Sequence, residues 1–149
     1  MIVLMARWRA EAFERLPELR DVITSADNVM ALWIELQYAF EKAYQAEAPD
    51  DSLIARIYSF ADWCEQAPRG PDASHDAPTA VTVAFYEHIP TSARAREDMP
   101  RWFRYADVAN HPKVFGYLIG DEDYRALLKH MAQNQNRYQA RGVGGRAAR

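Results

Sequence analysis

A chain of 149 residues with 49% hydrophobic and 12% aromatic content has the size and composition of one globular domain with its own core. The net charge of -3 and the lack of a dense basic stripe argue against a nucleic-acid-binding domain. The single cysteine, Cys64, excludes an internal disulfide and any zinc site built from several cysteines.

The chain begins with a short apolar run, Met1–Met5, followed by two predicted helices. This run is far shorter than the roughly 20 residues that span a bilayer, and it is too short for a signal peptide. We therefore expect no membrane segment and a soluble, cytoplasmic protein. The first helix should cover about residues 7–16, and a second short one should start at Pro17, because proline is favoured in the first turn.

The clearest predicted helix runs from about Asn28 to Glu47, with Asp27 or Ser25 as its N-cap. Ile34 and Tyr38 are apolar but lie off its main stripe. A helix with so much apolar circumference is expected at the centre of a fold. The main stripe recurs at steps of three and four residues and consists of Val29, Leu32, Trp33, Leu36, Phe40, Ala43 and Tyr44.

The next helix is predicted from Asp51 to Gln66, because Pro49 ends the helix before it and the acidic residues after Pro49 supply caps. Its spacing turns Cys64 inward, so this cysteine is interpreted as a small buried side chain rather than a reactive thiol. The next segment, Ala67–Pro78, contains three prolines and a glycine, which predicts a surface loop within the domain.

The segment Val81–Pro90, VTVAFYEHIP, has β-branched and aromatic residues that fit a buried strand as well as a helix. A strand would have no partner, since no other segment alternates or carries a hairpin turn. With Asp76 as the cap, we therefore predict a helix over about residues 79–89. That helix would place on one face Val81, Ala84, Phe85, His88 and Ile89.

Residues 91–100, TSARAREDMP, are polar and predict a loop or a single turn, followed by a short aromatic helix over residues 101–110. Asp121 would cap a last helix from Glu122 to about Gln139. Residues 141–149 are predicted to be a flexible tail. Together the elements predict one all-α domain over residues 1–140, a bundle of six or seven helices with orthogonal or irregular packing.

Charge is distributed unevenly along the chain. Residues 11–87 contain 15 acidic and 5 basic side chains, whereas residues 88–149 contain 6 acidic and 11 basic ones. This asymmetry fits an ordinary solvated surface, but it also favours a charged partner or head-to-tail self-association. Seven aromatic residues are expected in the core, and any that is exposed would instead mark an interface: Trp33, Tyr38, Phe40, Tyr44, Tyr58, Phe60 and Trp63.

The chain contains no phosphate-binding loop, no nucleophile elbow and no HExxH motif, so the sequence predicts no cofactor and no metal site. The candidate binding residues are Glu35, Glu87, His88, Arg101 and Trp102. If Glu35 is buried on the central helix, its carboxylate needs a partner, for which Arg101 or Arg104 is suited.

Glu87 and His88 have the residue types that transfer protons or bind metals, but adjacent positions on a helix point about 100° apart. We therefore interpret them as two residues with separate roles, His88 facing inward and Glu87 facing solvent or an arginine. The other histidines, at positions 75, 111 and 130, are expected at the surface because none lies near another ligand at metal spacing.

Four stretches resemble a family of small bacterial helical proteins, a domain of unknown function: ALWIELQYAFEKAY, LIARIYSFADWC, AVTVAFYEHIP and DMPRWF. The family pattern combines LW-EL---FE-AY and a helix ending in -WC with the motifs FYEH-P and MPRW. The resemblance covers Leu16 to Tyr124. It implies a compact helical domain and a recurrent polar set at Glu35, Glu87, His88, Arg101 and Trp102, but no activity.

Three functions follow as hypotheses. The first is an interaction or inhibitor protein, for example of the immunity type that neutralises a partner protein, and it is favoured by the aromatic content, the polarised charge and the missing catalytic motif. The second is an enzyme or metal-dependent hydrolase that uses Glu35, Glu87 and His88. The third is a structural homo-oligomer. We expect a protein that binds another protein or itself rather than an enzyme, with no nucleic-acid or membrane partner.

Overall fold

Residues 2–139 are described by the computed structural model, with side chains from residue 7 onward. Every regular element in this range is helical, which confirms the predicted all-α fold class. Its nine α-helices outnumber the six or seven expected, because four of them have six residues or fewer. None of the helices within this range is long and apolar enough to cross a membrane. The predicted tail, residues 141–149, lies outside the described residues.

The first half of the chain forms four α-helices joined by short turns. They are α1 (Ile2–Arg15), α2 (Arg20–Ser25), α3 (Val29–Gln45) and α4 (Asp51–Gln66), with a 3-10 turn, η1 (Pro17–Leu19), before α2. The cap expected for α3 at Asp27 or Ser25 is wrong. Asn28 has the extended backbone of an N-cap residue, and its Oδ1 accepts a hydrogen bond from the Ala31 N–H at 2.8 Å.

The segment that follows the 67–78 loop is built from helical turns, so the strand alternative is wrong. A 3-10 turn, η2 (Ala73–His75), leads into α5 (Ala77–Val81), a π-helical turn η3 (Thr82–Tyr86) and a 3-10 turn η4 (Ile89–Thr91). Asp76 caps α5 as predicted. Phe85 and Ile89 are fully buried, whereas His88 is only partly buried, because the π-turn changes the helical register before it.

The expected loop over residues 91–100 is wrong, because α6 (Ala93–Trp102) occupies it. Ser92 caps this helix, and Ala95, Met99 and Trp102 recur at steps of four and three residues and form its buried face. Of the charged residues between them, Glu97 is exposed, whereas Asp98 and Arg101 are partly buried. The short helix expected over residues 101–110 is therefore reduced to α7 (Tyr105–Ala109).

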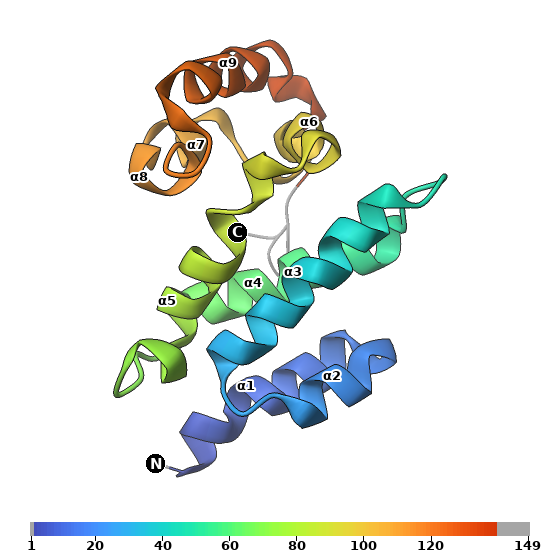
Figure 1. Ribbon diagram of the computed structural model, residues 1–149, viewed down its shortest axis with the longest axis vertical. Helices are drawn as coiled ribbons and strands as arrows, with labels where there is room; N and C mark the ends of the chain where they lie inside the picture. Colours follow the sequence, from blue (N-terminus) through green and yellow to red (C-terminus); the bar gives the residue numbers. More distant parts are fainter. Residues whose placement is uncertain (1, 140–149) are drawn as a thin grey trace.

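The chain ends in α8 (Pro112–Phe115), α9 (Gly120–Gln133) and a 3-10 turn, η5 (Gln135–Arg137). The expected cap at Asp121 is wrong, since α9 already begins at Gly120, where φ is 86°. The helix also ends at Gln133 rather than near Gln139. Figure 1 shows α6 to α9 gathered at one end of the molecule and α1 and α2 at the other, with α3, α4 and α5 between them.

An aromatic core fixes α6 against the central helices. The ring of Phe85 lies 4.8 Å from those of Trp33 and Phe40 on α3, measured between centroids. Tyr58 on α4 stacks on Trp102 of α6 at 4.9 Å. Rings in these arrangements contribute more than their buried area alone, so the two ends of the molecule share one core.

Cys64 lies inside this core, as predicted. The side chain is fully buried, and Trp33 Nε1 donates a hydrogen bond to its Sγ at 3.4 Å. Burial raises the pKa of the thiol to about 12. Cys64 is therefore a packing residue.

Candidate functional site

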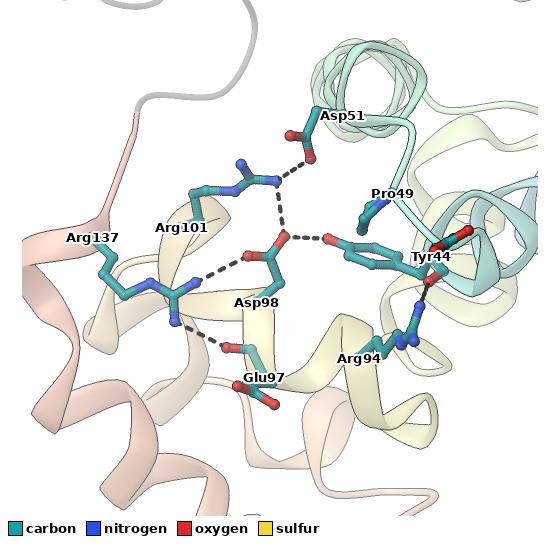
Figure 2. Close-up of a pocket in the computed structure, with 9 residues that line it drawn as sticks. Tyr44, Pro49, Asp51, Arg94, Glu97, Asp98, Arg101 and Arg137 are labelled. Carbon is teal, nitrogen blue, oxygen red and sulfur yellow. Dashed lines mark hydrogen bonds and ion pairs between the residues drawn. The ribbon is translucent and has the colours of Figure 1, made fainter.

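A surface pocket of about 350 Å³ lies where α6 and η5 meet the end of α3 and the start of α4 (Figure 2). Seven of its nine lining residues are charged, so the pocket differs from the mostly apolar pockets that hold small molecules. The lining residues are Tyr44, Glu47, Pro49, Asp51, Arg94, Glu97, Asp98, Arg101 and Arg137.

Asp98 is the centre of the polar contacts in the pocket. Its Oδ2 accepts hydrogen bonds from the Tyr44 hydroxyl at 2.6 Å and from Arg101 Nη2 at 3.0 Å. Trp102 Nε1 donates to the same oxygen at 3.2 Å. Arg137 Nη2 donates to Oδ1 at 3.1 Å. One carboxylate of α6 therefore contacts α3, its own helix and η5.

One further contact extends this cluster toward α4, and the cluster also shifts the pKa of the tyrosine. Arg101 Nη2 also donates to Asp51 Oδ1 at 2.9 Å, which links α6 to the first turn of α4. Burial raises the pKa of Tyr44, and its hydrogen bond to Asp98 raises it further. Tyr44 is therefore a neutral hydrogen-bond donor at ordinary pH.

Two arginines of the pocket also donate hydrogen bonds to backbone carbonyls. Arg94 Nη1 donates to the Tyr44 carbonyl at 2.6 Å and to the Ala46 carbonyl at 3.1 Å, which satisfies the free C=O groups at the end of α3. Arg137 Nη1 donates to the Glu97 carbonyl at 3.3 Å. Because all three arginines bind groups of the fold itself, we interpret the pocket as a polar joint between elements.

A different feature lies on the side of α3 that points away from the core. Ile34 and Tyr38 are one turn apart there and are 48% and 63% exposed. Glu35 and Lys42 are exposed on the same side. Neither of these charges, nor the Tyr38 hydroxyl, forms a hydrogen bond or ion pair with a described residue. We call Ile34, Glu35, Tyr38 and Lys42 the outer face of α3.

The core location expected for Tyr38 is thus wrong. Its position on α3 lies off the buried stripe, and no neighbouring helix covers it. By contrast, Trp33, Phe40, Tyr44, Tyr58 and Phe60 are buried as expected, and Trp63 is partly buried against the core.

The structure places the residues predicted for a site in three locations. Arg101 lines the pocket, and Trp102 is buried beside it with its ring 4.7 Å from the Arg101 guanidinium carbon. Glu35 is on the outer face of α3, so it needs neither Arg101 nor Arg104 as a partner. Only Arg101 and Trp102 are brought together by the fold.

Glu87 and His88 lie in the turn between η3 and η4 and are partly buried. Burial raises the pKa of the Glu87 carboxyl, and the nearby His88 lowers it in part. No hydrogen bond joins either side chain to another described residue. Within residues 7–139, no three His, Cys, Asp or Glu side chains are grouped so that they could hold a metal ion.

Apart from Arg101, sequence reasoning missed the residues of the pocket, among them Tyr44, Arg94, Asp98 and Arg137. The interpretation of residues 91–100 as a loop removed Arg94 and Asp98 from consideration. A usable signal was present, because Ser92 precedes a stripe of Ala95, Met99 and Trp102 at helical spacing.

Comparisons with family models, curated proteins and solved structures found no match to the chain.

Proposed function

We propose that this chain acts by binding another protein through the outer face of α3. The proposal is carried by the exposure of Ile34 and Tyr38, at 48% and 63%, on a helix whose opposite side is fully buried. Isolated exposed apolar residues are ordinary, but these two are one turn apart and form a continuous patch. Tyrosine is enriched at protein interfaces because its ring is rigid and its hydroxyl can still find a partner.

The charges beside this patch support the same function. Glu35 and Lys42 are exposed and unpaired with any described residue, so they contribute no ion pair to the stability of the chain itself. Charged groups around an apolar centre are the usual arrangement of a protein interface, where they select the partner and its orientation. An inhibitor or immunity-type protein would use such a face to cover the active surface of its partner, and this finer function stays a prediction.

No observation favours the enzyme hypothesis to the same degree. Glu35 is exposed on α3, whereas Glu87 and His88 lie in the turn after η3, and the pocket contains none of the three. A thermal-shift panel of divalent metals on the wild type and His88→Ala tests the metal-dependent version. Stabilisation of the wild type alone would favour that version over the binding function.

The binding function is tested by a photo-crosslinking amino acid placed at position 38 in the cell of origin. Position 117 is the matched control, because Tyr117 is also a tyrosine and is 69% exposed, in the turn before α9. We expect a discrete adduct between position 38 and a different protein that disappears when Ile34→Ser is added, and none from position 117. No adduct at position 38, or equal adducts at both positions, would contradict the proposal.

A further inference from the structure

The outer face of α3 is complementary to itself. Glu35 precedes Tyr38 by three residues and Lys42 follows it by four, so Tyr38 has a negative charge on one side along the helix and a positive charge on the other. Seven residues are almost two helical turns, so Glu35 and Lys42 point the same way, roughly 10 Å apart along the axis. A twofold interface requires such a patch, because the same surface contributes both sides of the contact.

We propose that the outer face of α3 pairs with the same face of a second copy of this chain, with the two helices antiparallel. An axis beside residues 38 and 39 places Glu35 of each copy opposite Lys42 of the other. The two Tyr38 rings then lie next to each other at the centre, with Ile34 beside them. Parallel pairing would instead place like charges together, so the charge order allows one orientation only.

A second pair of exposed apolar residues, in the turn before α9, fits this face less well. Tyr117 and Leu118 are 69% and 44% exposed in the turn before α9. Three acidic residues follow them in the first turn of that helix, Asp121, Glu122 and Asp123. Docked on the outer face, this turn would bring acidic side chains toward Glu35 and the acidic half of the chain. Charge complementarity therefore favours α3 of a second copy.

The size of the face sets the strength of the pairing. One helix face covers less area than a standard stable interface, so association should be reversible and depend on concentration. This inference rests on the proposed function, because the dimer covers the surface proposed to bind another protein. Self-pairing would then compete with that partner and set the concentration of chains that are free to bind it.

The test uses charge reversal and its repair, followed by sedimentation velocity from about 10 μM to about 1 mM, the range of a weak interface. The variants are Glu35→Lys, Lys42→Glu and the double variant with both changes. The double variant has the composition of the wild type and restores opposite charges across the axis. Glu122→Lys is the control, because Glu122 is also an exposed acidic residue, on α9.

We expect dimers for the wild type, the double variant and Glu122→Lys, and at least about tenfold weaker association for each single reversal. A wild type that stays monomeric over the whole range would overturn the inference, as would a double variant that behaves like the single ones. The two proposals fail separately. If position 38 cross-links a different protein while the chain is monomeric, the binding function stands and only self-pairing is wrong.

Discussion

The hydroxyl of Tyr44 donates a 2.6 Å hydrogen bond to Oδ2 of Asp98, although the two residues are 54 positions apart in the chain. Tyr44 is near the end of α3 and Asp98 is on α6, so this bond connects the central helix to the other end of the molecule. Only 3% of Tyr44 is exposed, which shields the bond from competing water.

Removal of this hydroxyl by Tyr44→Phe should lower the free energy of unfolding by about 1 to 2 kcal/mol, because a hydrogen bond to a charged acceptor is lost. Phenylalanine keeps the ring that packs against Phe40 at 5.2 Å between centroids. Urea unfolding measures the effect. Tyr38→Phe is the control, since its hydroxyl contacts no described residue, and it should change stability by less than about 0.5 kcal/mol. Equal losses in both variants would contradict the prediction.

The same bond predicts a pH dependence at the alkaline end. Burial, and then the hydrogen bond to Asp98, raise the pKa of Tyr44 above the ordinary value of about 10. The folded chain therefore retains this proton while the unfolded chain loses it. The contribution of Tyr44 to stability is complete below about pH 10 and is lost as the pH rises further. The stability difference between the wild type and Tyr44→Phe should be the same at about pH 8 and pH 9 and smaller at about pH 11, and a constant difference would contradict this assignment.

Asp98→Asn should destabilise the fold by about 1 to 3 kcal/mol, because an amide cannot accept hydrogen bonds at both of its ends. Arg137 donates to one oxygen of Asp98 and Arg101 to the other, so the new NH₂ group would face a donor. Glu97→Gln is the matched control on the next residue, whose exposed side chain binds no described group. Urea unfolding at pH 7 should separate the two variants, and similar stabilities would show that Asp98 is not the centre of the joint.

The long helices could be predicted because their signals are local. α3 and α4 show apolar spacing over 17 and 16 residues, and Pro49 with Asp50 fixes the boundary between them. α6 was missed because charged residues and Pro100 dominate its sequence, while its buried face uses only a few apolar residues. The amphipathic spacing of α6 was a weaker local signal than its charged residues and Pro100. The helix forms because its apolar face packs against the core.

The two sites depend on contacts between distant segments, which no local pattern reports. The spacing on α3 shows that Tyr38 lies off the buried stripe, but only the positions of the other helices show that none of the described segments covers it. Likewise, Tyr44 and Asp98 meet because the aromatic core sets α6 beside α3. The sequence supplied plausible polar residues, and the fold brought a different group of them together.

Cys64 should be inert in the folded protein. Burial raises its thiol pKa to about 12, so almost no thiolate forms at pH 8, and the sulfur is also inaccessible. An aromatic disulfide reagent at pH 8 should react in denaturant within the mixing time of the experiment and far more slowly without it. Fast reaction of the native chain would contradict the buried position. Tyr44→Phe provides a second check, because the reaction should accelerate as the variant unfolds more often.

Asp76 should give the fold an acid-sensitive contribution to stability. Its Oδ1 accepts a hydrogen bond from the Gly70 N–H at 2.6 Å, and its Oδ2 accepts one from the Thr79 N–H at 3.1 Å. Arg69 adds an ion pair at 3.3 Å. Burial alone would raise the pKa of this carboxyl, but the hydrogen bonds from Thr79 and Gly70, with the charge of Arg69, outweigh it and lower the pKa.

Because the folded pKa of Asp76 lies below the unfolded value of about 3.9, its contribution is complete above that value and is lost as the pH falls through the folded pKa. Asp76→Asn keeps a residue that caps helices well, but it removes the charge and turns an NH₂ group toward one of the two N–H donors, a loss that the protonated carboxyl shares at low pH. It should be about 1 kcal/mol less stable than the wild type at pH 7, and the gap should narrow progressively as the pH falls below about 4. The control is Asp27→Asn, because Asp27 is exposed and its side chain forms no hydrogen bond or ion pair with a described residue; this variant should show no gap at either pH. A gap for Asp76→Asn that stays constant in urea unfolding as the pH is lowered would mean that the cap acts through shape rather than charge.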